Sequence, residues 1–396
     1  MRLGIVRQRY TPFGGAERFV ERAIDALVER GVHVQIYTRK WPQGGDRRVE
    51  PVLCDPFYAG SLWRDASFAA AVRAALARDR PDLVQSHERI EGCDIFRAGD
   101  GVHRVWLEER VRTGGRVERM RIAANPYHRY VQDAEARMFA SPALKAVICI
   151  SQMVRDDIRR HFTLPDARLH VIYNAVDPRE FNPAVRVNRA ATRADLGLAD
   201  DHVAFLLVGS DYARKGVATA IRALARLPAT ARLIIVGRDK APGRYRRLAQ
   251  RERVGDRVIF AGPHEDPRRF LGAADAFVLP TLYDPLSNAV LEALACGLPV
   301  VTSRRCGAGE LVVAHDAGFI CDAIDVTAFA ERMRTLLDSD ERARRAERAP
   351  GAVASLTPDD MTRRMLDLYG TLLGRPALAA SPLSGPRDGI RLPHGP

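Results

Sequence analysis

Short apolar blocks alternate with longer amphipathic blocks along most of the chain. An apolar run of about four to eight residues predicts a buried strand, and apolar residues three or four apart predict a helix. In the first half, the predicted strands cover 2–8, 32–38, 82–87 and 145–151, and the predicted helices cover 16–30, 66–79 and 152–162. Residues 95–106 fit a strand or a loop equally well.

The second half repeats this rhythm. Its predicted strands cover 203–210, 231–238, 257–262, 276–281, 299–303 and 318–321, with helical segments such as 216–227 between them. Strands that alternate with helices favour parallel sheets covered by helices on both faces. Two such series predict an α/β protein with two Rossmann-like domains, over residues 1–175 and 176–357. The Pro-, Gly- and Ser-rich residues 376–396 predict a disordered tail.

The composition permits several partners. The chain has 396 residues, of which 46 % are hydrophobic, and a net charge of +12. This charge suits a polyanionic partner, such as nucleic acid, an anionic membrane or a phosphorylated substrate. A compositional bias toward Arg explains the charge equally well, because lysine stands only at Lys40, Lys145, Lys215 and Lys240.

The cysteines and the N-terminus bear on the compartment. The six cysteines form no CxxC pair and have no histidine at metal-ligand spacing, which favours a reducing cytoplasm. The chain opens directly on a predicted strand rather than a signal peptide. No apolar run approaches the ~20 residues that span a bilayer. We therefore expect a cytoplasmic protein with at most peripheral membrane contact.

Cations follow one of the predicted strands. Parallel sheets bind ligands at the carboxyl ends of their strands. The stretch "SDYARKG" places Arg214 and Lys215 at such an end, just before a helix. Their side chains and the helix amides suit a phosphate group. A solvated basic turn is the alternative, although the rarity of lysine favours a role for Lys215.

The stretch "LYDPLSNAVLEALACGLPVV" follows another predicted strand. Leu286, Ser287 and Asn288 open its helix, so their amides point outward and favour an anion. Ser287 could instead cap the helix with its side chain.

The same stretch carries two acids. Glu292 lies on an apolar helix, where a carboxylate is costly to bury without a partner. A sugar diol is such a partner, and Asp284 in the preceding loop could hold a second set of hydroxyls. One acid would then bind a ribose and the other a transferred sugar. An ion pair with an arginine remains the alternative for Glu292.

Two stretches of the first half are further candidates. "TPFGGAER" places Gly14 and Gly15 after the first strand, where a ligand can approach the backbone, but it is not a GxGxxG fingerprint. A tight turn explains these glycines equally well. "AGDGVH" places Asp100 and His103 between and after glycines near a strand end, where they either face a cleft or serve the structure.

Together these motifs resemble the retaining glycosyltransferases of the GT-B fold, in the large family numbered 4. The resemblance rests on the "GG" turn, "YNAVD" at the domain junction, "RKG", and the two acids before "EALACG", and it covers residues 1 to about 372. Asp284 stands where that family usually has Glu, and Ser210 stands where it often has Arg. "RYTPFGGAERF", "VGSDYARKGV" and "AGD" are also similar to the lipopolysaccharide core glucosyltransferases.

This resemblance implies two parallel sheets that face each other across a cleft. The first domain would bind a glycan or glycolipid acceptor such as lipopolysaccharide core, and the second a nucleotide sugar, UDP-glucose by the narrower similarity. It also implies a helix over 358–375 that crosses back to the first domain. The implied reaction is a metal-independent, retaining hexosyl transfer that needs no cofactor besides the nucleotide sugar.

The resemblance also implies residue roles. Arg214, Lys215 and the amides of residues 286–288 would stabilise the departing diphosphate. Glu292 would bind the ribose, and Asp284 would act on the transferred sugar. Asp100 or His103 would position the acceptor or the 6-hydroxyl of the sugar. The remaining implied donor contacts are Gly14, Gly15, Gly209 and Ser210.

The arginines of 109–121 would suit an anionic membrane at the cytoplasmic face, although a solvated helix explains them too. Two other functions compete. An epimerase or phosphorylase on the same fold lacks this pair of acids, and an epimerase needs an acid and a base that the sequence does not reveal. A non-catalytic polyanion binder accounts for the charge alone, but no nucleic-acid-binding signature is present.

Overall fold

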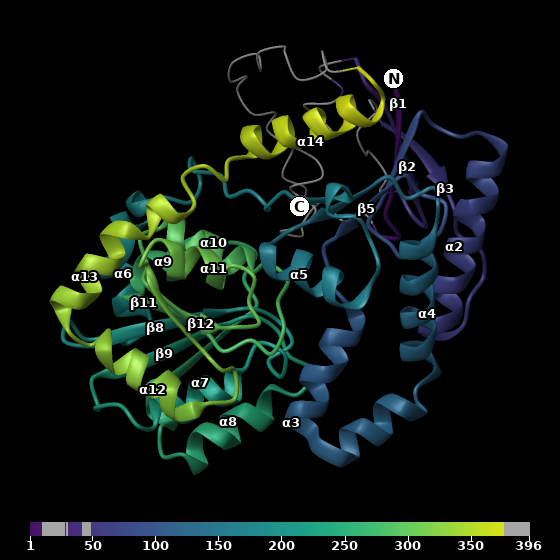
Figure 1. Cartoon of the computed structure of the whole chain (residues 1–396). Coiled ribbons are helices and arrows are strands. Elements are labelled where there is room, and N and C mark those ends of the chain that lie inside the picture. The colour runs from purple at the N-terminus through teal and green to yellow at the C-terminus, as the bar shows by residue number, and fades with distance from the viewer. Residues whose placement is uncertain (10–27, 29–30, 42–48, 376–396) are drawn as a thin grey trace, which may run out of the picture.

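The computed structural model describes residues 1–9, 28, 31–41 and 49–375. Two parallel sheets lie side by side, each covered by helices (Figure 1). The predicted α/β class with two Rossmann-like domains is therefore confirmed. The predicted helix 16–30 apart from residue 28, the glycine turn at Gly14 and Gly15, and the tail 376–396 lie outside the described residues.

The first sheet has seven strands in the order β3-β2-β1-β4-β5-β6-β7. Five of them correspond to predicted or ambiguous segments, because buried parallel strands are continuous apolar runs. The two edge strands, β3 and β7, were not predicted. The strands are β1 (Arg2–Val6), β2 (His33–Thr38), β3 (Val49–Leu53), β4 (Leu83–Ser86), β5 (Ile95–Ala98), β6 (Ala146–Cys149) and β7 (Leu169–Val171).

The second sheet has six strands in the order β10-β9-β8-β11-β12-β13, and all of them were predicted. The strands are β8 (Val203–Val208), β9 (Ala231–Val236), β10 (Val258–Gly262), β11 (Ala276–Leu279), β12 (Val300–Ser303) and β13 (Gly318–Cys321). Figure 1 shows α7, α8 and α12 on one side of this sheet and α9, α10 and α11 on the other.

The helices of the first half include two that the sequence pattern did not reveal, α3 and α4. They are α2 (Gly60–Arg78), α3 (His103–Ala124), α4 (Pro126–Ala140) and α5 (Gln152–His161). The helices of the second half are α6 (Arg189–Asp195), α7 (Val217–Leu224), α8 (Pro242–Arg251), α9 (Arg268–Ala273), α10 (Asn288–Ala295), α11 (Gly309–Ala314), α12 (Val326–Thr335), α13 (Ser339–Arg348) and α14 (Pro358–Leu372). Short 3₁₀ turns cover Asp166–Arg168, Pro183–Asn188, Gly255–Arg257 and Pro350–Ala352.

The last helix, α14, returns to the first sheet (Figure 1). Its Met365 and Tyr369 are buried in one cluster with Leu3 and Ile95 of β1 and β5. The Tyr369 hydroxyl donates a hydrogen bond of 2.7 Å to Gln85 Oε1 in β4. The final helix therefore completes the core of the first half of the chain.

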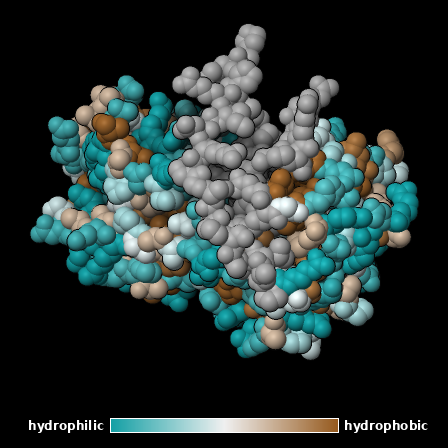
Figure 2. All heavy atoms as spheres, turned by 90° about the horizontal axis from the view of Figure 1, so that it is seen from above, coloured by the Kyte–Doolittle hydropathy of each residue, from teal (hydrophilic) through white to brown (hydrophobic). Residues whose placement is uncertain are grey.

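The surface is mostly polar. The face shown in Figure 2 is largely hydrophilic, and its apolar residues form small separate groups. Among the helices of the described ranges, none combines the length and apolar character that crossing a bilayer requires.

Candidate functional site

An open pocket of about 1130 Å³ lies at the carboxyl ends of β8, β9 and β10. This volume is slightly above the usual range of small-molecule sites, and it suits a ligand as long as a nucleotide sugar. The pocket is lined by Val208, Ser210, Asp211, Arg238, Asp239, Lys240, Pro263, His264, Glu265, Pro267 and Glu292.

Lys215 and Asp284 form a buried ion pair close to this pocket. Lys215 Nζ lies 2.5 Å from Asp284 Oδ2, and their side chains are 10 % and 8 % exposed. Arg214 adds a more distant contact, with Nη1 3.9 Å from the same oxygen. The structure thus brings together the cations and the first acid that the sequence singled out, and it holds them as one charged cluster.

Two glycines shape this cluster. A Cβ at Gly209 would lie 2.9 Å from Cε of Lys215, so the glycine leaves space for the lysine chain. Gly216 has a φ of 72° and precedes α7, and a Cβ there would lie 1.8 Å from the carbonyl oxygen of Pro280. This close approach places the Lys215 turn directly against the chain that leads to Asp284.

The N-terminus of α10 carries an unsatisfied hydroxyl. Ser287 occupies the cap position, but its side chain makes no capping hydrogen bond, so the capping alternative is wrong. Its Oγ is buried and has no hydrogen-bond partner among the described residues. A buried polar group without a partner is costly unless a ligand satisfies it. The first amides of the helix also lack intrahelical acceptors, so this end of α10 suits an anion.

The other predicted donor contacts lie around the same end of the sheet. Glu292 is half-buried on α10 and lines the pocket. Ser210 Oγ accepts a hydrogen bond of 3.2 Å from the amide of Arg238. Leu286 is buried, and Asn288 Oδ1 accepts a hydrogen bond of 2.8 Å from Nδ2 of Asn174.

Asp100 lies in the turn between β5 and α3, and His103 is the first residue of α3. The Asp100 side chain is 81 % exposed and lies 3.7 Å from Nη1 of Arg89. His103 Nε2 lies 3.1 Å from Nδ1 of His128. Burial, and the nearby charges of Arg89 and Arg110, lower the pKa of His103 to about 3. His103 is therefore neutral at physiological pH, and its imidazole can both donate and accept a hydrogen bond.

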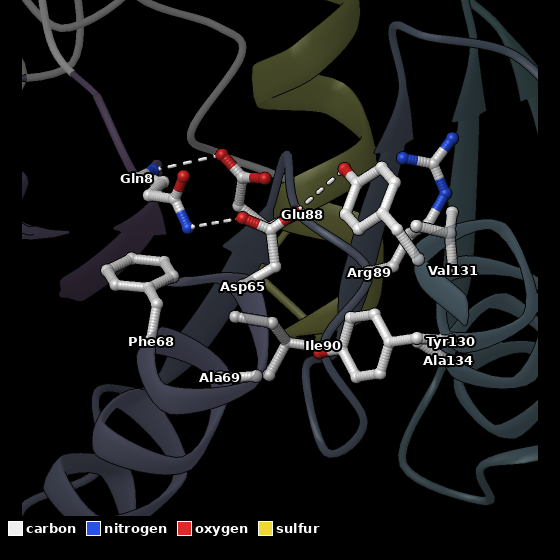
Figure 3. Close-up of a pocket in the computed structure, with 11 residues that line it drawn as sticks. Gln8, Asp65, Phe68, Ala69, Glu88, Arg89, Ile90, Tyr130, Val131 and Ala134 are labelled. Carbon is white, nitrogen blue, oxygen red and sulfur yellow. Dashed lines mark hydrogen bonds between the residues drawn. The ribbon is translucent and has the colours of Figure 1, made fainter. Parts of the chain in front are cut away.

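A second, small pocket of about 40 Å³ lies at the carboxyl ends of β1 and β4 (Figure 3). Glu88 Oε1 accepts a hydrogen bond of 3.0 Å from the backbone amide of Gln8. Asp65 accepts from the Gln8 side chain at 3.1 Å and from the Tyr127 hydroxyl at 2.9 Å. Burial raises the pKa of Glu88, and the charge of Asp100 raises it further. The sequence analysis missed these residues, although the rule on strand ends also points to Glu88.

Among the described residues, no group of three or more His, Cys, Asp or Glu side chains is placed to hold a metal ion. The metal independence of the reaction stays a prediction.

Comparison with known proteins places both halves of the chain. Residues 13–180 match the model of glycosyltransferase family 4, and residues 188–350 match the model of glycosyl transferases group 1. The lipopolysaccharide glucosyltransferase WaaG of Escherichia coli K12 is 26 % identical over 317 residues, which cover 79 % of this chain and 83 % of that protein. A glycogen synthase of Mycobacterium tuberculosis is 30 % identical over 387 residues, which cover 88 % of this chain and 89 % of that protein.

Solved structures agree on the fold. A crystal structure of WaaG, a glycosyltransferase involved in lipopolysaccharide biosynthesis, superposes with a TM-score of 0.78 at 24 % identity, over 92 % of this chain and 99 % of that one. The Anabaena protein HepE, in complex with UDP and glucose, superposes with a TM-score of 0.69 at 20 % identity, over 94 % of this chain and 100 % of that one.

Proposed function

Because this chain belongs to the glycosyltransferases of group 1 and family 4, we propose a specific reaction for it. It transfers a hexose from a UDP-sugar, with UDP-glucose the first choice, to a glycan or glycolipid such as lipopolysaccharide core. The transfer retains the anomeric configuration and needs no metal. The name of the glucosyltransferase WaaG and the complex of HepE with UDP and glucose support a glucose donor, and both family models argue against an epimerase.

The observation that carries this proposal is the buried, unpartnered hydroxyl of Ser287 at the start of α10. The donor diphosphate would accept its hydrogen bond together with those of the amides of residues 286–288. Lys215 and Arg214 would stabilise the negative charge that grows on the diphosphate as the glycosidic bond breaks. Asp284 holds Lys215 in place and keeps its second carboxylate oxygen for a hydroxyl of the transferred sugar.

Glu292 would bind the ribose, since it lines the large pocket and lies about one and a half turns beyond Ser287 on α10. The base would then reach Pro263, His264 and Glu265, which follow β10. The donor would thus run from the β10 loop toward the start of α10.

The proposed reaction needs no base from the protein. The bond from the anomeric carbon to the diphosphate oxygen breaks, and a bond to the acceptor oxygen forms on the same face. The acceptor proton passes to an oxygen of the departing diphosphate. Asp100 and neutral His103 would hold the acceptor or the sugar 6-hydroxyl by hydrogen bonds.

The distal part of α3 supports contact with an anionic membrane. The helix is kinked at Gly115, whose φ is 60°. Beyond the kink, Val117 and Met120 are 55 % and 64 % exposed, next to exposed arginines at 116, 119 and 121. Apolar side chains among arginines favour the interface of a negatively charged bilayer. We propose that this segment brings the enzyme to a lipid-borne acceptor at the cytoplasmic face.

A thermal-shift panel tests the donor. UDP, GDP, ADP and their common sugar conjugates are compared with and without EDTA. A ligand at ~100 times its Kd should stabilise the fold by about 2.7 kcal/mol. A shift with UDP compounds alone, unchanged by EDTA, is the expected result. No shift with any compound, for protein shown to be folded, would overturn the proposal and favour a polyanion binder.

A further inference from the structure

One of the contacts between the two halves of the molecule is made by the hydroxyl of Tyr283, the residue that precedes Asp284. The Tyr283 side chain is buried, and its hydroxyl accepts a hydrogen bond of 3.0 Å from the amide of Val102 in the first half. A Cβ at Gly101 would lie only 2.1 Å from this hydroxyl oxygen. The contact therefore exists because residue 101 is glycine.

The tyrosine ring is fixed from the other side. The Arg305 guanidinium carbon lies 5.3 Å from the ring centroid of Tyr283. Arg305 Nη2 pairs with Asp157 Oδ2 at 3.0 Å, and its Nε lies 3.5 Å from Glu109 Oε1. The Tyr283 hydroxyl lies 3.5 Å from Asp157 Oδ2. Arg305 and Tyr283 come from the second half, whereas the two acids come from the first, so the cluster spans both.

The backbone segments on either side of this contact carry the residues proposed for the donor and for the acceptor. On the donor side, the amide of Asp284 donates to the carbonyl of Arg305 at 2.9 Å, and the Asp284 carbonyl accepts from the Gly307 amide at 2.9 Å. On the acceptor side, Val102 is flanked by Gly101 and by His103, whose amide donates to Glu135. A displacement at Tyr283 therefore changes the distance between Asp284 and the segment from Asp100 to His103.

We infer that Tyr283 is a positioning residue, which sets the Asp100–His103 loop against Asp284 and so aligns the acceptor with the anomeric carbon of the donor. This inference rests on the proposed function. Loss of this one contact should have a large effect on the rate, because a shift of about 1 Å between reacting groups can reduce the rate about 100-fold.

The main test is Y283F, which keeps the ring and removes only the hydroxyl. Its loss leaves the buried Val102 amide unpaired in the aligned state, so kcat should fall about 10- to 100-fold. The KM for the nucleotide sugar should stay within about threefold, because the proposed contacts to the diphosphate, the ribose and the base all lie in the second half. The matched control is Y369F, which removes another buried hydroxyl with a 2.7 Å hydrogen bond, to Gln85, away from this contact. It should keep wild-type kcat.

A second measurement does not depend on activity. Hydrogen exchange of the Val102 amide should accelerate at least tenfold in Y283F and stay unchanged in Y369F. G101A should reproduce the kcat loss, whereas G197A should not, although Gly101 and Gly197 have similar φ values of 67° and 65° and only Gly101 has a neighbour within 4 Å.

Unchanged kcat in Y283F, or unchanged exchange at Val102, would overturn the inference. These outcomes differ from failure of the proposed function. If wild-type protein transferred sugar from no nucleotide donor, the proposed function would fall, and the positioning role would fall with it.

Discussion

Replacing Lys215 with methionine should destabilise the protein and weaken diphosphate binding together. The substitution keeps most of the side-chain volume and removes the charge 2.5 Å from Asp284. Removing one partner of a buried ion pair costs about 3–5 kcal/mol, because the other charge stays buried without its counterion. Arg214, at 3.9 Å, compensates in part, so we expect a loss near 3 kcal/mol. For a unit of 150–250 residues this corresponds to a drop of roughly 6–12 °C in Tm.

The same substitution should separate the phosphates from the nucleoside in binding. A hydrogen bond to a charged group contributes about 1.5–3 kcal/mol, so affinity for UDP should fall about 10- to 150-fold. Affinity for uridine should change little, since Lys215 does not line the pocket proposed for the ribose and base. Denaturant unfolding and isothermal titration calorimetry measure the two effects.

The matched control is Lys145→Met. Lys145 Nζ also pairs with a buried acid, Asp94, at 3.0 Å, but the lysine is 47 % exposed. Asp94 keeps Arg80 and the Val84 amide as partners, so the loss should stay at or below about 1 kcal/mol. The reasoning is refuted if Lys215→Met costs no more than this control, or if UDP and uridine lose affinity equally.

Three further substitutions test other parts of the site. Glu292→Gln should lower kcat/KM for the donor about 100-fold, because a neutral amide is a weaker acceptor for the ribose hydroxyls than a carboxylate; normal turnover in steady-state kinetics would exclude the ribose contact. Ser287→Ala removes a buried hydroxyl that has no partner in the described structure, so the free protein should be as stable or more stable while UDP affinity falls about fivefold; calorimetry that shows a less stable free protein would contradict this. The pKa of His103 is about 3 in the folded protein, whereas the unfolded chain protonates this histidine near pH 6.5. The unfolded chain therefore binds more protons between pH 6.5 and 4, so the free energy of unfolding should decrease over this range as the pH falls, by at most about 1.4 kcal/mol per pH unit. His103→Gln should flatten that slope in urea titrations, and an unchanged slope would assign it to other groups.

The strands that the sequence pattern predicted and those it missed differ in burial. All six strands of the second sheet are short apolar runs, because helices cover both faces. The missed strand β3 reads "VEPVL" and has mostly exposed positions at the edge of its sheet. The missed strand β7 has only three residues. An edge strand needs no continuous apolar run, so hydrophobic periodicity carries little signal there.

In the candidate site, the sequence predicted individual residues but not the long-range contacts between them. Arg214, Lys215 and Asp284 could be selected from the sequence because each follows a strand, and parallel strands bring their carboxyl ends to one edge. The pairing of Lys215 with Asp284 could not, since nothing local distinguishes a cation aimed at a ligand from one aimed at an acid 69 residues away. The contact between Tyr283 and Gly101 lies further from sequence reasoning, because it depends on how one half of the chain sits against the other. The proposed transfer requires such a placement, and Tyr283 and Gly101 lie in stretches that the sequence marked for other residues, so their contact with each other had no signal of its own.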